Sequence, residues 1–137
     1  MTMPVSIRFR PDVLARLQQR ARAAGTVPST LAQRLVDEGL RLAEHPGVVF
    51  RDGPSGRRAG LVAGPDVAEV VVTMAMQVGG PQARARATAE MLTLRPGQVE
   101  TALAYRAAFP EEIDAEVSAA AAAREVALAQ LGRADAG

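Results

Sequence analysis

The stretch VSIRFRPDVLARLQQRARAAG, residues 5–25, decides the predicted fold of the N-terminal part of the chain. From Val5 to Arg10 apolar and polar side chains alternate, which is the pattern of a half-buried strand. A helical pattern begins directly after Pro11, and Gly25 is a natural place for that helix to stop. No second strand follows with which the first could pair, so the backbone of residues 5–10 needs a partner from elsewhere.

A second helix is predicted from Pro28 to about residue 44, because proline suits the first turn of a helix. Its apolar residues cover more than one stripe of the surface, which indicates burial from several sides. A single partner helix cannot bury this helix from several sides.

The simplest partner for the lone strand is the same strand from a second copy of the chain. A two-fold axis through the strand gives an antiparallel ribbon, in which unpaired backbone groups of both copies are satisfied. We expect an obligate homodimer with a shared core, and the residues assigned to it are Val5, Ile7, Phe9, Leu31 and Leu35.

The strand VSIRF, the helix DVLARLQQRARAAG and the helix STLAQRLVDEGLRLA together resemble the ribbon-helix-helix fold of CopG-type repressors and many antitoxins, over residues 4–44. The resemblance implies that the ribbon enters the major groove of a palindromic DNA operator, with Ser6, Arg8 and Arg10 facing the bases. Ser29 and Thr30 would bind phosphates at the start of the second helix. The turn GTVPS departs from the family, since Val27 cannot cap a helix as serine does.

Charge is distributed unevenly along the chain. Residues 1–60 contain ten arginines and five carboxylates, whereas residues 61–137 contain six arginines and ten carboxylates. This asymmetry favours two partners of opposite character. The chain contains neither cysteine nor lysine, so disulfides, a Walker-type phosphate loop and a Schiff-base lysine are excluded. We expect no enzyme activity, no catalytic residues, no cofactor and no metal site.

The second part of the chain is predicted as a β-hairpin followed by helices. The strands are expected at Val48–Phe50 and Ala59–Val62, joined by DGPSG. A helix should follow, with Asp66 and Glu69 as a capping box. A helix-turn-helix-like corner is expected over Ala83–Ala108, with the hydroxyl of Tyr105 at the surface. Its charge favours a structural corner over a second DNA reader.

The overall prediction is a mainly α fold with short β-strands and three parts. Residues 1–45 form the ribbon-helix-helix domain, residues 46–110 the hairpin and helical domain, and residues 111–137 a C-terminal helix that binds a partner. No stretch predicts a membrane span, so a cytoplasmic protein is expected.

Residues 48–117 resemble a small domain found in bacterial antitoxins paired with PIN-fold ribonuclease toxins. The resemblance rests on a hairpin with a basic tip and on the run QV..AL.Y.A..PEEID. It implies an antitoxin whose C-terminal helix binds the toxin, and the candidate contacts are Ile113, Val117, Arg124 and Leu128. One alternative is a stand-alone repressor whose second domain senses a ligand or mediates oligomerisation. Another is a structural or partition protein that assembles along DNA.

Overall fold

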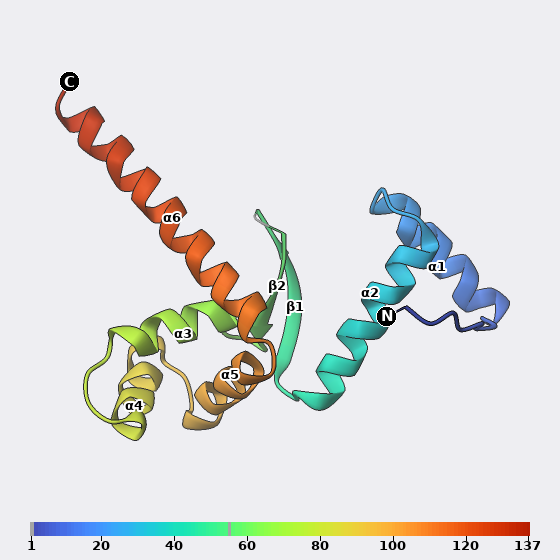
Figure 1. Ribbon diagram of the computed structural model, residues 1–137, viewed down its shortest axis with the longest axis horizontal. Helices are drawn as coiled ribbons and strands as arrows, with labels where there is room; N and C mark the ends of the chain where they lie inside the picture. Colours follow the sequence, from blue (N-terminus) through green and yellow to red (C-terminus); the bar gives the residue numbers. More distant parts are fainter. Residues whose placement is uncertain (1, 55) are drawn as a thin grey trace. The chain divides into compact units, whose positions relative to one another are not determined.

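The computed structural model describes residues 2–54 and 56–137. The chain divides into two compact units, Met1–Ala43 and Glu44–Gly137. Within the described residues there are six helices and one two-stranded antiparallel sheet (Figure 1). The expectation of a mainly helical fold with short strands is therefore confirmed.

The first unit contains two helices, α1 (Pro11–Ala23) and α2 (Pro28–Glu44), and the last residue of α2 begins the second unit. Both helices lie where the sequence predicts them. Gly25 stands between them with φ of +67°, a left-handed conformation that glycine adopts without steric cost. The amide of Thr26 donates to the carbonyl of Ala21 at 3.0 Å, which closes the end of α1.

Residues 2–10, which precede α1, have no regular secondary structure. The strand expected over Val5–Arg10 is not formed in the single chain, and the reason is physical: no segment of the first unit is extended alongside it. Val5, Ile7 and Phe9 are all exposed, although their alternation with polar residues is typical of a buried strand face.

The apolar residues of the first unit are mostly uncovered. Its buried hydrophobic side chains are those of Ala21 and Leu31 alone among the described residues. Of the dimer-core residues expected from the sequence, only Leu31 is already buried within one chain. The exposed large apolar residues of the two helices are Leu14, Leu35, Val36, Leu40 and Leu42. A single copy of this unit therefore lacks a closed core.

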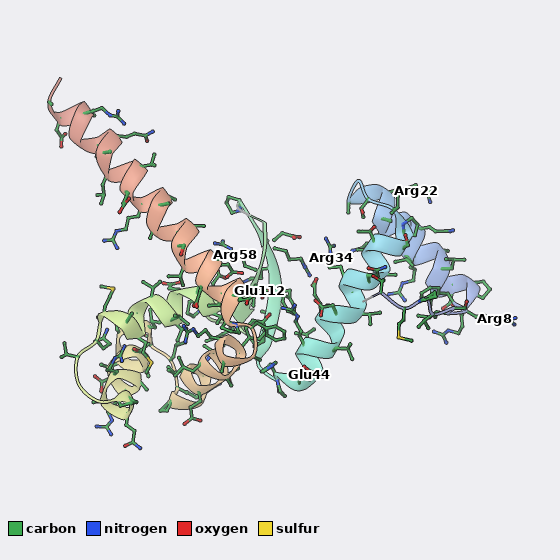
Figure 2. All side chains as sticks on the ribbon, viewed as in Figure 1. Arg8, Arg22, Arg34, Glu44, Arg58 and Glu112 are labelled. Carbon is green, nitrogen blue, oxygen red and sulfur yellow. The ribbon has the colours of Figure 1, made fainter. Side chains whose placement is uncertain are left out.

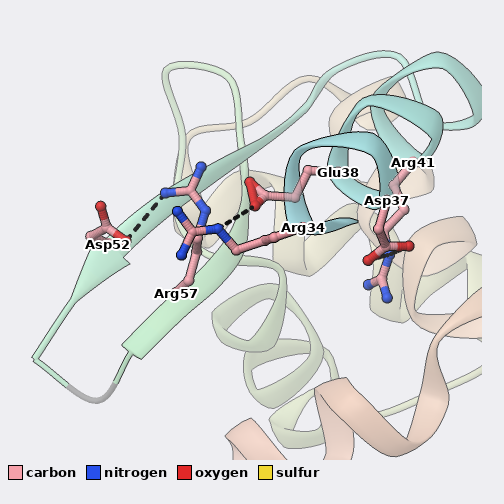
Figure 3. A network of polar contacts seen from close by, with 6 residues as sticks. All are labelled: Arg34, Asp37, Glu38, Arg41, Asp52 and Arg57. Carbon is pink, nitrogen blue, oxygen red and sulfur yellow. Dashed lines mark hydrogen bonds and ion pairs between the residues drawn. The ribbon is translucent and has the colours of Figure 1, made fainter. Parts of the chain in front are cut away.

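The second unit begins with a hairpin of β1 (Val48–Gly53) and β2 (Gly56–Leu61). Pairing runs from Val48–Leu61 to Gly53–Gly56, so both strands extend further toward the tip than the sequence predicts, and β2 ends before Val62. An ion pair of 3.2 Å between Arg57 and Asp52 on neighbouring strands accompanies this extension (Figure 3). Asp52, Gly53 and Gly56, expected in the turn, therefore belong to the strands.

Four helices follow the hairpin: α3 (Val67–Met76), α4 (Pro81–Leu92), α5 (Pro96–Ala108) and α6 (Pro110–Asp135). Helix α3 is central and contacts α4, α5, α6 and β2 (Figure 1). Its expected helical state is confirmed, in spite of its run of valines. The buried core has members from both strands and all four helices: Val48, Ala59, Leu61, Val67, Val70, Ala89, Val99, Ala102, Tyr105 and Ile113.

Two polar residues of the second unit differ from expectation. Asp66 precedes α3 but makes no capping hydrogen bond, because its carboxylate binds Arg51 and Arg58 instead. The hydroxyl of Tyr105 is not at the surface: the residue is fully buried, and its Oη donates to Oε2 of Glu112 at 3.0 Å. Both predictions were wrong because partners distant in sequence determine where these groups point.

Candidate nucleic-acid interface

An open apolar groove of about 600 Å³ crosses the first unit. Its apolar lining comes from the N-terminal segment, α1 and α2, and includes Phe9, Val13, Leu17, Leu35 and Val36. Sequence reasoning assigned Phe9 and Leu35 to a shared core but overlooked Val13. The signal was present, since Val13 and Leu17 are separated by one turn of the predicted helix.

The residues expected to read DNA bases lie in the extended segment before α1. Ser6, Arg8 and Arg10 are all exposed, and Figure 2 labels Arg8 at the start of the first unit. Arg10 lies 3.7 Å from the carboxylate of Asp12, and both side chains are mostly exposed. Ion pairs of this kind contribute little, so Arg10 remains available to an external anion.

The residues expected to bind phosphate lie at the N-terminus of α2. Pro28 has no N–H. The first amide of α2 that donates an i to i−4 hydrogen bond is that of Leu31, whose acceptor is the carbonyl of Val27 at 3.1 Å. The amides of Ser29 and Thr30 therefore have no intrahelical acceptor. Both side chains are exposed as well, so amides and hydroxyls lie together at one end of the helix.

Positive charge in the first unit is concentrated before α2. The unit contains seven arginines and three carboxylates. The two carboxylates of α2 that belong to the first unit each lie near an arginine one turn away: Glu38 near Arg34 at 3.7 Å, and Asp37 near Arg41 at 3.2 Å (Figure 3). The excess positive charge thus belongs to the N-terminal segment and α1, the same elements that carry the candidate base-reading residues.

The candidate partner-binding residues of α6 fall into two groups. Ile113 is fully buried in the core and Val117 packs against it, so the first two turns of α6 pack on the rest of the second unit and Ile113 is no surface contact. Arg124 and Leu128 lie in the other group, where every residue from 118 to 137 is exposed. Leu128 is 58% exposed. Among the described residues, no helix is both long enough and apolar enough to cross a membrane.

The second unit also contains a cavity of about 370 Å³ that sequence reasoning did not find. Arg95, Gln98 and Thr101 line it, together with Ala63 and Thr93, the non-glycine residues with positive φ in the described chain. The φ of 55° at Thr93 is accounted for by the end of α4, where its amide donates to Glu90. Nothing in the local pattern signals this cavity, because its walls come from four separate segments.

Comparison of the chain with family models, curated proteins and solved structures finds no match. Among the described residues there is also no cluster of three or more histidine or carboxylate side chains that could bind a metal ion.

Proposed function

We propose that the chain is a DNA-binding antitoxin whose first unit forms a ribbon-helix-helix homodimer on a palindromic operator. The observation that carries this proposal is the unclosed apolar surface of the first unit. Val5, Ile7 and Phe9 are exposed on a segment with no pairing partner, next to the open groove between α1 and α2. A second copy supplies both a strand for the segment and helices for the groove.

The DNA-binding role follows from the alternation along the segment. When Val5, Ile7 and Phe9 face a shared core, Ser6, Arg8 and Arg10 face outward. A two-stranded ribbon fits the major groove, and an arginine can bind guanine through two hydrogen bonds. The unpaired amides of Ser29 and Thr30 are suited to a phosphate, which fixes position without reading sequence.

Neutralisation of a co-encoded toxin is proposed for the exposed part of α6. Residues 118–135 form five turns of helix without any cover, and Val126, Leu128 and Leu131 are apolar side chains among them. Such a surface is suited to a partner protein. The resemblance of residues 48–117 to antitoxin domains favours a PIN-type ribonuclease as that partner, with Arg124 and Leu128 as contacts. Ile113 is withdrawn from the contact set because it is buried, and Val117, which packs against the core, lies outside the exposed part of α6.

The alternative is a stand-alone repressor with a ligand-sensing second unit. The cavity of about 370 Å³ favours this alternative, since Arg95, Gln98 and Thr101 offer polar groups to a small molecule. The two functions differ in their partner. An antitoxin copurifies with the product of a neighbouring gene, whereas a ligand sensor releases DNA when a small molecule is added.

The DNA-binding proposal is tested by selecting bound sequences from random duplexes with the wild-type protein and three variants. Arg8→Ala should relax preference at one position of each half-site, by about 5- to 150-fold for the loss of a bidentate contact. Ser29→Ala should weaken binding to all sequences alike. Arg133→Ala, in the exposed part of α6, is the control and should change neither. If Arg8→Ala keeps the base preference of the wild-type protein, Arg8 does not recognise a base.

The toxin proposal is tested by copurification from the source cell. Truncation after residue 117 leaves Ile113 and the core in place and should abolish capture of the toxin. Truncation after residue 133 is the matched control and should retain capture. Equal capture by both truncated proteins would refute a role for residues 118–133.

A further inference from the structure

The base of α6 lies within a cluster of charged groups that the proposed function does not use. Glu116 is in the second turn of α6, and Glu112 lies one turn earlier on the same helix. Arg58 from β2 and Asp66 from the segment before α3 act on Glu116 electrostatically. Figure 2 labels Arg58 and Glu112 on these elements.

The arginines of the cluster are engaged by Asp66. Arg51 donates to Oδ1 of Asp66 at 3.1 Å and also to the carbonyls of Leu61 and Gly64, at 3.2 and 3.0 Å. Arg58 lies 3.3 Å from the other oxygen, Oδ2. One carboxylate is thus held between two guanidinium groups, each already oriented by it.

Glu116 has no comparable compensation. Its Oε2 atom is buried and has no hydrogen-bond partner among the described residues. Its neighbour Glu112 accepts a hydrogen bond from Tyr105 and carries the same charge. Burying an ionised carboxylate oxygen without a partner is costly, whereas a neutral carboxyl group is tolerated better and brings an O–H that a nearby carboxylate can accept.

The remaining charged groups of the packed elements do not supply a partner. In α3 the charged residue is Glu69, which is exposed. In α5, Glu100 is exposed, and Arg106 is paired with Asp114 at 3.1 Å. Arg58 is therefore the cation that acts on Glu116 against the negative charges of Glu112 and Asp66.

We propose that Glu116 makes the anchorage of α6 on α3 and α5 sensitive to pH: its neutral form fits the partly buried position at the base of the helix, and its charged form weakens the packing there. This inference uses contacts within the second unit alone and does not depend on DNA or toxin binding.

The direction of the effect follows from the electrostatics. Burial raises the pKa of Glu116 above its ordinary value of 4.5, Glu112 and Asp66 raise it further, and Arg58 opposes them. The folded state therefore holds this proton more tightly than the unfolded state. The resulting stabilisation is complete below pH 4.5 and is lost as the pH rises through the pKa of the folded protein.

The direct test is a carbon-13 NMR titration of the glutamate side chains in the full chain. The Glu116 carboxyl should titrate above pH 4.5, and Arg58→Gln should move its midpoint further up, because the opposing cation is removed. A midpoint at or below 4.5 in the wild-type protein would overturn the proposal, as would an unchanged midpoint in Arg58→Gln.

The consequence for α6 is tested by native-state hydrogen exchange between pH 4 and 8. After correction for intrinsic exchange, protection of the amides in α6 should fall with rising pH, by up to about tenfold for each unit by which the pKa is raised. Glu116→Gln should abolish this change. Glu125→Gln, on the exposed part of the same helix, should retain it. If protection of the α6 amides in Glu116→Gln falls with pH as it does in the wild-type protein, the inference is refuted.

Discussion

Truncation of Ile7 to alanine distinguishes a dimeric first unit from a monomeric one. Ile7 is 62% exposed in the single chain. If the protein functions as a monomer, Ile7→Ala removes side-chain atoms that mostly contact water, and stability should hardly change. If the apolar side of residues 5–9 closes onto a second copy, the same substitution removes a buried side chain twice in each dimer.

The expected loss can be worked from the exposed fraction. Complete burial of an isoleucine side chain contributes about 1.5–3 kcal/mol. The 62% that a single chain leaves exposed therefore corresponds to about 1–2 kcal/mol in each copy. Two copies give about 2–4 kcal/mol, so the dimer dissociation constant should rise by between about 30-fold and several hundredfold.

Sedimentation equilibrium measures this constant directly, and urea unfolding at two protein concentrations provides a second readout. The wild-type midpoint should rise with concentration, because only the associated state has a closed core. Val78→Ala is the control, since Val78 is 90% exposed in the second unit. A wild-type protein that is monomeric at micromolar concentration would refute the dimer. An Ile7→Ala dimer that dissociates no more readily than the control would refute the burial of Ile7.

The remaining predictions concern local features. Tyr105→Phe removes the donor to Glu112 and should lower the unfolding free energy by about 1–2 kcal/mol in urea; a change below measurement error would contradict the bond. Gly25→Ala should cost about 1 kcal/mol through positive φ alone, because no atom lies within 4 Å of the added Cβ. Gly132→Ala, in a helix with open space around it, should instead increase helical circular dichroism. Deletion of residues 118–137 should leave the melting temperature of the second unit nearly unchanged, because those residues are exposed; a large decrease would show that they pack on the unit.

Local patterns predicted the helices of the first unit well. Leu14, Leu17 and Ala21 recur at helical spacing, and α1 and α2 begin at Pro11 and Pro28, positions that proline favours. The end of α1 close to Gly25 was predicted equally well, because it depends on the residues of one helix end. These features are decided by neighbours within a few residues.

Features that depend on distant residues were not predictable in the same way. Asp66 has the spacing of a capping residue, but Arg51 and Arg58 bind it across 15 and 8 positions of the chain. Ile113 continues an apolar stripe along α6, and only the position of α3 and α5 shows that this part of the stripe is covered. Periodicity identifies an apolar face without identifying what covers it.

Residues 5–10 are the extreme case of this dependence, because the proposed partner strand belongs to a second copy of the chain. The alternation along the segment nevertheless constrains the answer. Side chains in an extended strand point alternately to opposite faces, and a shift by one residue exchanges the faces completely.

In one register Val5, Ile7 and Phe9 are buried and the polar residues between them face solvent. The other register buries Arg8 and Arg10 and exposes the apolar residues, at a cost of several kcal/mol for each unpaired buried charge. The arrangement that closes the dimer core is therefore the arrangement that presents two arginines per chain on one outward surface. In the proposed dimer, strand pairing and the presentation of these arginines are one structural event, so a variant that reverses the alternation should abolish both.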